Sequence, residues 1–382
     1  MPFASALSEH PVSSLATGEV IGAVVEALGE RPDLVVLTVT RPHLGALDDI
    51  VAAVDGVLHP LAMIGGAAAS VVGTGREVEE GPAVSLWAAR VGPLVPVALR
   101  AGRGTDGEWD YPGWPTTLAF APTALVLVAD PFTFPSPDFL GWVGTRHPGL
   151  PVIGGNASAG SRPGVNRLVT GSRTVSEGAV GVLLGAGVSV ETVLSQGARP
   201  YGRPLTVTRA ERNIVHEVAG RPALEVLVAQ ITDDLGSVDV AGLEANGFHL
   251  GRQIDEHLEL AGPGDFLVRS VTGVDHASGA IAVDDRMPVG CTVRFHVRDA
   301  DAAGRDLRAS LAGHGADGVL LFTCDGRGTR FFDEPDHDTS ALAEALGPVP
   351  VGGCFAAGEF GPVGGTSFLH TFTASMALLR DR

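Results

Sequence analysis

The chain has 382 residues, which is enough for about two to three domains. Its 45 % hydrophobic and 18 % charged residues are typical of a globular protein with a large interior and exclude a disordered chain. The formal net charge of -18 argues against unaided binding to nucleic acid or to an anionic membrane, because both need clustered basic residues.

All 26 basic residues are arginine, since the sequence contains no lysine. This excludes a Schiff-base lysine, a pyridoxal-phosphate anchor and the lysine of a P-loop. The first basic residue is Arg31, so the N-terminus lacks the positive region of a signal peptide. No uninterrupted apolar stretch reaches the roughly 20 residues of a spanning helix. We therefore expect a cytoplasmic protein without a transmembrane segment.

The predicted elements repeat one pattern three times, in residues 33–68, 123–158 and 317–358. Each copy has a strand with a continuous apolar run, a helix, and a second short strand that ends in Gly-Gly and a small residue. Continuous apolar runs are typical of strands covered on both faces, and an intervening helix suits a parallel crossover. The pattern predicts three βαβ units.

Other segments have a different pattern. Residues 82–91 and 178–185 have the pattern of antiparallel strands. Residues 203–220 predict two strands around a charged turn. A helix is expected from Arg221 to about Leu235.

Towards the C-terminus, residues 264–299 alternate apolar and polar side chains in three short runs, which predicts an antiparallel meander. Residues 367–379 predict a terminal helix that carries His370, Thr373 and Ser375.

These elements predict an α/β fold in which repeated βαβ units form two mixed-sheet halves, with the antiparallel meander in the C-terminal half. The Pro-, Gly- and Arg-rich segment 199–203 separates two repeats from the third. We therefore divide the chain into domains of residues 1–200 and 201–382.

The Gly-Gly pairs at Gly65, Gly154 and Gly352 are candidate walls of a ligand pocket, because small residues after strands let a ligand approach. Asn156 follows the second pair and is a candidate ligand-binding residue. The alternative is that these glycines allow close packing or a left-handed turn.

The densest set of reactive side chains lies in the C-terminal region. Cys324 and Arg327 follow the strand of the third repeat, and Gly358 and Glu359 follow the next strand. His370 and Thr373 come shortly after. If the two strands are neighbours, Arg327 can hold a carboxylate, Glu359 can receive an amine, and His370 or Cys324 can donate a hydrogen bond.

Each of these residues also has a structural interpretation. Arg327 can pair with Glu359 or with the C-terminus of a helix, and His370 can be a satisfied core histidine. Cys354 fits a small buried apolar residue. We expect Cys324 to be the most reactive thiol of the three cysteines, because Arg327 and open backbone amides would lower its pKa.

Metal and cofactor motifs are absent from the sequence. The three cysteines, Cys291, Cys324 and Cys354, are too far apart for a Cys-x-x-Cys site, and His249 and His257 lack the spacing of a zinc helix. The acidic run 333–338 fits a solvated loop that caps a helix. No GxSxG or HExxH motif occurs, and we expect neither haem nor structural zinc.

The chain resembles the FIST family of ligand-sensing domains. The resemblance spans nearly the whole chain and is carried by these segments: 3–10, 64–87, 203–227, 320–328, 349–365 and 368–379. Where many relatives have Gly-Cys-Ser after the first repeat, this chain has Gly65, Gly66 and Ala67, so any role of that cysteine is absent.

This resemblance implies a sensory module for a small ligand, with amino acids as the proposed class, that signals through a separate partner protein. It carries over Cys324, Arg327, Glu359, His370 and Thr373 as matching motif residues, together with the glycines at 326, 328 and 358. In F-box relatives the cysteine matched by Cys324 is reactive, and some bacterial relatives bind haem and report nitric oxide to a kinase.

The leading hypothesis is a stand-alone cytoplasmic sensor of an amino acid or other small carboxylate, without a cofactor. Two alternatives stay open. One is an enzyme that uses Cys324 or the Glu359–His370 pair as nucleophile or acid–base group. The other is a haem-based nitric oxide sensor.

Overall fold

The computed structural model describes residues 2–382 except 106, 236–247, 259–260 and 263. These described residues form two units. The larger unit contains the chain up to Leu194 together with Leu307–Arg382, and the smaller unit is Ser195–Asp306.

Within the described residues, the larger unit contains three six-stranded sheets. The first has the order β1 (Phe3–Ser8), β6 (Val84–Ala89), β2 (Leu34–Thr40), β3 (Ala62–Ala68), β12 (Leu168–Thr170), β13 (Arg173–Val175). The second has the order β7 (Leu94–Leu99), β14 (Ala179–Leu184), β10 (Ala124–Ala129), β11 (Val152–Asn156), β25 (Glu359–Val363), β26 (Thr366–His370). The third has the order β15 (Val188–Gln196), β27 (Thr373–Asp381), β23 (Gly318–Cys324), β24 (Val351–Ala356), β4 (Ser70–Gly73), β5 (Arg76–Glu79).

A parallel pair of strands lies in the middle of each sheet. A helix joins the two strands of each pair, and these helices are α2 (Leu47–Leu58), α3 (Ser136–Arg146) and α8 (His337–Leu346). The three segments expected to be strand–helix–strand units therefore have parallel strands. They belong to three mixed sheets, whereas the sequence led us to expect two mixed-sheet halves.

The hairpin that follows each strand–helix–strand segment pairs with a different segment. The hairpin β4–β5 follows the first segment but pairs with β24 of the third. The hairpin β12–β13 follows the second segment and pairs with β3 of the first, and β25–β26 follows the third and pairs with β11 of the second. The next strand in the chain then returns to its own sheet as β6, β14 or β27. The three sheets consequently have the same order of pairing.

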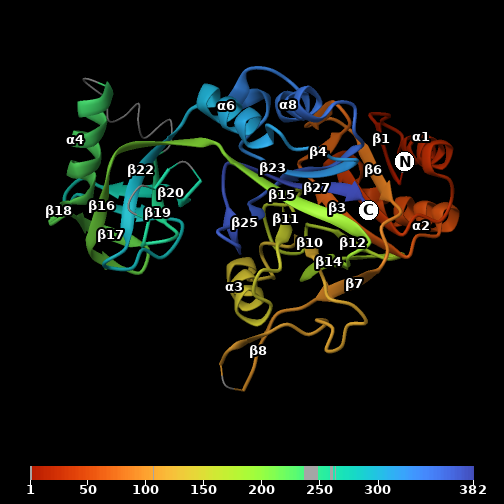
Figure 1. Ribbon diagram of the computed structural model, residues 1–382, viewed down its shortest axis with the longest axis horizontal. Helices are drawn as coiled ribbons and strands as arrows, with labels where there is room; N and C mark the ends of the chain where they lie inside the picture. Colours follow the sequence, from red (N-terminus) through yellow and green to blue (C-terminus); the bar gives the residue numbers. More distant parts are fainter. Residues whose placement is uncertain (1, 106, 236–247, 259–260, 263) are drawn as a thin grey trace. The chain divides into compact units, whose positions relative to one another are not determined.

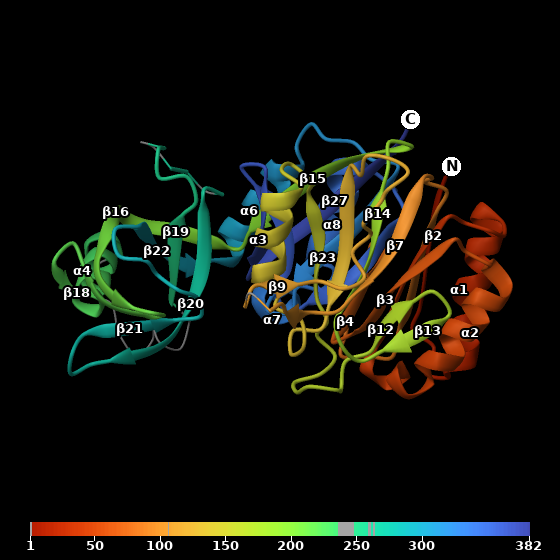
Figure 2. The same cartoon turned by 90° about the horizontal axis from the view of Figure 1, so that it is seen from below.

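The apolar core of the larger unit has a central part and three outer parts. Buried side chains from all three sheets meet in the central part, among them Val36, Ile64, Val126, Ile153 and Leu320. The outer faces of the sheets are covered by α1 (Ser13–Leu28) and α2, by α3, and by α8 with the last residues of α6 (Ala300–Leu311) (Figures 1 and 2). Two short helices, η1 (Arg41–Ala46) and α7 (Thr329–Phe332), follow β2 and β23.

The second strand of each parallel pair contains a glycine that the pairing requires. Gly65, Gly154 and Gly353 have φ angles of 139°, 146° and 139°. A Cβ at any of them would overlap a carbonyl oxygen of the first strand, that of Leu37, Leu127 or Leu321. These glycines permit close approach of two backbones inside a sheet. In the third segment the equivalent residue is Gly353, one position later than the Gly-Gly pattern suggests.

The smaller unit is an antiparallel sheet that closes on itself. Its order is β16 (Ala198–Glu211), β22 (Thr292–Arg298), β19 (Phe248–Gln253), β20 (Phe266–Asp275), β21 (Ala280–Val283), β17 (Ile214–Val218), β18 (Arg221–Pro222), and β16 also pairs with β17. The helix α4 (Ala223–Leu235) packs against its core. The two strands and the helix expected in 203–235 are confirmed.

Two sequence expectations need correction. The third run of the expected meander, β22, pairs with β19 and β16 and has no ladder with β21 in the described sheet. The expected terminal helix is wrong, because residues 367–379 form most of β26 and β27. Both faces of β27 are buried from Thr373 to Leu379, so its apolar residues follow the continuous pattern of an internal strand and show no alternation.

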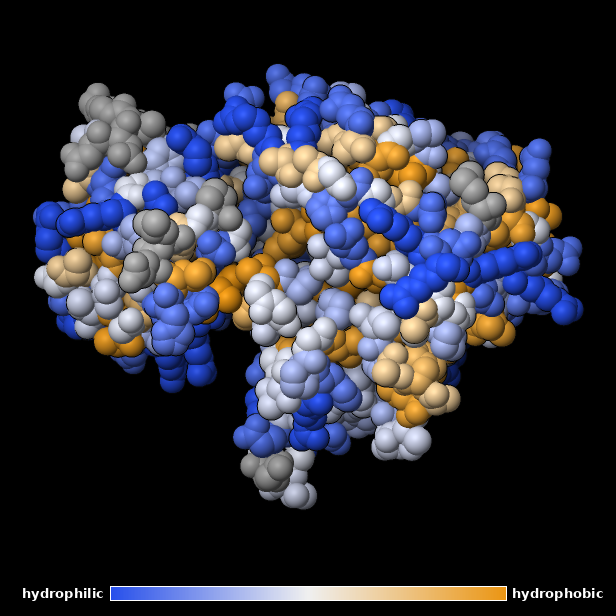
Figure 3. Space-filling view, viewed as in Figure 1, coloured by the Kyte–Doolittle hydropathy of each residue, from blue (hydrophilic) through white to orange (hydrophobic). Residues whose placement is uncertain are grey.

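In the chain, the smaller unit lies between β15 and β23, just before the third segment. Before the first segment, α1 occupies the equivalent place between β1 and β2. Before the second segment, the short ladder of β8 (Gly102–Arg103) and β9 (Trp109–Asp110) occupies it, between β7 and β10. Among the described residues, no helix has both the length and the apolar character to cross a membrane. The face in Figure 3 mixes hydrophilic residues with smaller apolar areas.

Candidate functional site

The candidate site lies in the larger unit, where β23 and β24 end. Cys324 ends β23 beside Ala356, which ends the parallel partner β24. Glu359 begins β25 and lies opposite Gly155 of β11, so the exchanged hairpin brings it to the second segment. A Cβ at Gly155 would lie 2.5 Å from the Cβ of Ala356, which explains the small residue there. The carboxyl ends of parallel strands are where α/β sheets commonly bind ligands.

Glu359 is fully buried. Its Oε2 accepts hydrogen bonds from the hydroxyl of Thr373 at 2.8 Å and from the backbone N–H of Thr373 at 3.1 Å. Its Oε1 has no hydrogen-bond partner among the described residues. Burial raises the pKa of Glu359 to about 8, although both bonds from Thr373 act in the opposite direction. The carboxyl group is therefore mostly protonated at neutral pH.

His370 is the cross-strand partner of Glu359 in the hairpin β25–β26. Its side chain is buried, and its Nε2 lies 3.0 Å from the carbonyl oxygen of Gly361, to which it donates. This ring nitrogen is held by the backbone of its own hairpin. The contact matches the interpretation of His370 as a satisfied core histidine.

Arg327 is also buried, and its guanidinium is bound to Asp338 at the start of α8. Nε and Nη2 donate to the two oxygens of Asp338 at 2.9 and 2.8 Å. Asp338 also accepts from the hydroxyl of Thr323 at 2.6 Å and lies 2.8 Å from Nδ1 of His337. Burial alone would raise the pKa of Asp338, but Arg327 holds it well below its usual range. The fork of Arg327 is thus occupied by a side chain of the protein.

The thiol of Cys324 does not have the properties expected from the sequence. Burial raises its pKa well above the ordinary value, and the nearby Glu359 and Asp325 raise it further. Arg327 cannot reverse this effect, because its charge is paired with Asp338. The expected lowering of the pKa by Arg327 is therefore wrong. Cys354 is equally buried, whereas Cys291 is partly exposed.

Asn156 and Gly358 connect the second and third segments at this site. The backbone N–H of Asn156 donates to the carbonyl of Gly358 at 2.9 Å, and its Nδ2 donates to the carbonyl of Ala357 at 3.2 Å. Its Oδ1 accepts from the hydroxyl of Ser136 at 2.8 Å. Gly358 has a φ of 105°, which favours glycine. Asn156 therefore positions the turn that precedes Glu359.

The structure thus brings the predicted residues into one region, but with different roles. Glu359 and Cys324 lie near each other at the strand ends, Thr373 holds Glu359, and Asn156 and Gly358 shape the turn. Arg327 and His370 form their hydrogen bonds with other groups of the protein, namely Asp338 and the carbonyl of Gly361.

The sequence analysis missed two buried carboxyl groups at the start of α8. Asp338 was interpreted as part of a solvated acidic run, although it is the partner of Arg327. Glu77, on the exchanged strand β5, accepts from the N–H of Thr339 at 2.8 Å. Burial and the neighbouring Asp338 raise the pKa of Glu77 to about 8. The acidic run at the start of α8 placed Asp338 among candidate helix caps but did not mark it as a counter-ion, and no local signal indicates Glu77.

Comparison with protein families assigns both parts of the chain. The model of the FIST N domain matches residues 33–221, and that of the FIST C domain matches residues 223–362. Asn156 lies in the first match, and Cys324, Arg327 and Glu359 lie in the second. His370 and Thr373 lie just beyond it.

Curated relatives cover nearly the whole chain. The uncharacterized protein Mb0898c of Mycobacterium bovis is 40% identical over 366 residues, which are 93% of this chain and 92% of the relative. The uncharacterized protein Rv0628c of Mycobacterium tuberculosis is 40% identical over 369 residues, 93% of each chain. Neither name states an activity.

Proposed function

This chain belongs to the FIST family, whose domains are sensory domains, and we propose that it is a cytoplasmic sensor of a small ligand that acts through a separate signalling partner. The proposed ligand is an amino acid or a similar small carboxylate. The observation that carries the proposal is Glu359, a fully buried carboxyl group with one oxygen bound and the other without a partner among the described residues. A buried polar atom without a partner costs stability, which is a reason to expect a ligand there.

The ammonium group of an amino acid fits the free oxygen of Glu359. An ammonium donates hydrogen bonds and carries the positive charge that favours the ionised carboxylate. Because Glu359 is mostly protonated at neutral pH, binding of the ammonium group releases a proton. The affinity should therefore rise as the pH increases from about 6 to about 8.

The carboxylate of the ligand requires a cation near Glu359. Arg41 is exposed and acts electrostatically on Asp325, which in turn acts on Glu359. Its guanidinium is fixed by the carbonyl oxygens of Ala159 and Ser158, at 2.5 and 3.3 Å. We propose that Arg41 provides this charge, and that Arg327 supports the site from within through Asp338.

The enzyme alternative has less support from the geometry. A nucleophilic thiol needs a lowered pKa, whereas burial raises the pKa of Cys324. His370 donates to a backbone carbonyl through Nε2 and is therefore not placed to activate Glu359 through that nitrogen. A ligand-binding role for these side chains needs neither a lowered pKa of Cys324 nor a histidine that activates Glu359.

Isothermal titration with the standard amino acids and their N-acetyl derivatives tests this function. An amino acid should bind with release of a proton, which buffers of different ionisation enthalpy reveal. Glu359→Gln should weaken that binding about 10- to 150-fold, because a charge-assisted hydrogen bond is lost. Glu80→Gln is the control, since the side chain of Glu80 is 75% exposed in a surface ion pair with Arg330. Unchanged affinity in Glu359→Gln would exclude this site.

A further inference from the structure

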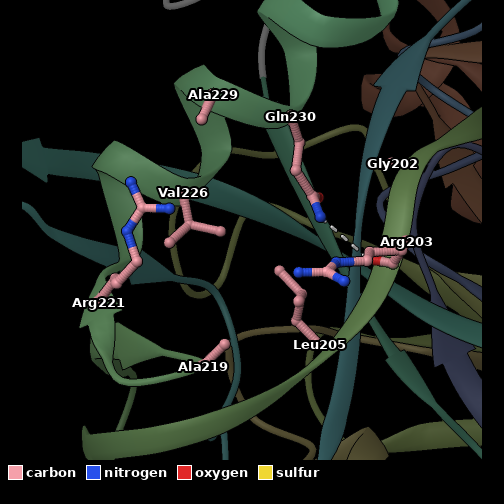
Figure 4. Close-up of a pocket in the computed structure, with 8 residues that line it drawn as sticks. All are labelled: Gly202, Arg203, Leu205, Ala219, Arg221, Val226, Ala229 and Gln230. Atoms are coloured by element: carbon pink, nitrogen blue, oxygen red, sulfur yellow. Dashed lines mark hydrogen bonds between the residues drawn. The ribbon is translucent and has the colours of Figure 1, made fainter.

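A cavity lies within the smaller unit, between α4 and the strands β16 and β18. Its volume is about 490 Å³. Apolar side chains of Leu205, Ala219, Val226 and Ala229 line it, and Arg203, Arg221 and Gln230 add polar groups (Figure 4). A cavity with an apolar lining and a few polar groups is typical of small-molecule sites.

The two arginines reach this cavity from opposite sides, Arg203 from β16 and Arg221 from β18 (Figure 4). Arg221 is paired with Glu225 at 2.6 Å. Arg203 has no carboxylate partner among the residues that the structure describes. The cavity therefore has one guanidinium whose charge is available for an anion.

Gln230 contributes an acceptor with a defined orientation. Its Nε2 lies 3.3 Å from the carbonyl oxygen of Arg203, and a carbonyl oxygen can only accept, so the amide nitrogen must face it (Figure 4). Its Oε1 is buried and has no hydrogen-bond partner in the described part of the chain. A buried carbonyl oxygen of this kind is satisfied by an N–H or O–H group of a ligand.

The backbone beside Gln230 is shaped to leave room for this carboxamide. Gly202 has a φ of 58°, and a Cβ there would overlap the carboxamide of Gln230. Any other residue would be strained and would displace the acceptor. Gly202 thus keeps Gln230 in place next to Arg203.

We propose that this cavity is a second ligand site, separate from the Glu359 site, for a small carboxylate with an adjacent N–H or O–H group and a short apolar chain. Arg203 binds the carboxylate, and Oε1 of Gln230 accepts from the N–H or O–H group. The apolar chain lies against Leu205, Val226 and Ala229. The site lies entirely within the smaller unit, so it does not require the residues around Glu359.

Titration calorimetry with N-acetylleucine tests this proposal, because this compound has all three features and no ammonium group. Binding should be saturable at millimolar concentration. N-acetylleucinamide, which lacks the carboxylate, should bind at least about 10-fold more weakly. 4-Methylpentanoate, which lacks the N–H group, should bind about 2- to 10-fold more weakly.

Variants locate the binding. Arg203→Met should weaken the binding of N-acetylleucine at least about 10-fold. Arg209→Met is the matched control, since Arg209 lies on the same strand and pairs with Glu217, and it should leave the affinity unchanged. Gln230→Leu should remove the preference for N-acetylleucine over 4-methylpentanoate.

Three results would overturn the proposal: no saturable binding, equal affinities in Arg203→Met and Arg209→Met, or an unchanged preference in Gln230→Leu. Glu359→Gln separates the two sites, because it should leave the binding of N-acetylleucine intact. The second site can therefore fail while the Glu359 site is confirmed, or the reverse.

Discussion

The first and third strand–helix–strand segments are followed by hairpins with equivalent pairing but different chemistry. The hairpin β4–β5 places Val71 across from Val78, whereas β25–β26 places Glu359 across from His370. In the hairpin β12–β13, which follows the second segment, the equivalent cross-strand pair is Leu168 and Val175. Two of the three hairpins have an apolar pair at this position, so the fold does not require an acid there in the third hairpin. Burying a carboxyl group costs stability, which is typical of a functional residue.

The largest expected effects concern what the three segments share. Gly65→Ala, Gly154→Ala and Gly353→Ala should each lower the free energy of unfolding by more than about 4 kcal/mol or prevent folding, because the added Cβ overlaps the neighbouring strand. Urea denaturation measures the change. Gly56→Ala is the control: it lies in α2 with open space around it, so alanine should stabilise the protein by about 0.5–1 kcal/mol. If one of the three positions tolerates alanine, the segments are not equivalent.

A second prediction concerns the buried ion pair of the third segment. Asp338→Asn should lower the free energy of unfolding by about 3–5 kcal/mol, because it leaves the charge of Arg327 buried without a counter-ion. Glu344→Gln, which removes an exposed pair between Arg308 and the same helix, should cost less than about 1 kcal/mol. Similar losses in the two variants would show that burial does not distinguish these pairs.

The third prediction uses the raised pKa of Glu359. The folded protein keeps a proton on this carboxyl group up to about pH 8, whereas the unfolded chain releases it near the ordinary value of 4.5. Stability therefore falls as the pH rises between these two values, by about 1.4 kcal/mol per pH unit. As the pH rises from about 5.5 to 7.5, the free energy of unfolding of Glu359→Gln should therefore decrease by about 2–3 kcal/mol less than that of the wild type.

Chemical denaturation at a series of pH values measures this difference. Glu77→Gln should remove a similar contribution, because the pKa of Glu77 is also raised to about 8. Glu80 is exposed, so Glu80→Gln should show the same dependence of stability on pH as the wild type. Parallel curves for Glu359→Gln and the wild type would mean that Glu359 is ionised in the folded protein at neutral pH.

Sequence reasoning succeeded where a pattern is local. Continuous apolar runs, repeated three times with a helix between them, predicted the strands and helices of the three segments, because these patterns depend on neighbouring residues. It failed where the answer depends on distant residues. The partner of Arg327 is Asp338, and nothing in the spacing of the acidic run separates a cap from a buried counter-ion. The hairpin exchange has no local signal, so the contact of Glu359 with the second segment was not predicted.

The exchange of hairpins has a consequence for synthesis of the protein on the ribosome. The strand β4 finds its partner only when β24 has been made, because Val71 pairs with Cys354. Until then the nascent chain carries an unpaired strand edge and exposed apolar side chains, the conditions under which chains aggregate. None of the three sheets can be completed by its own segment. The ring of exchanged hairpins can therefore close only after β24 has been synthesised.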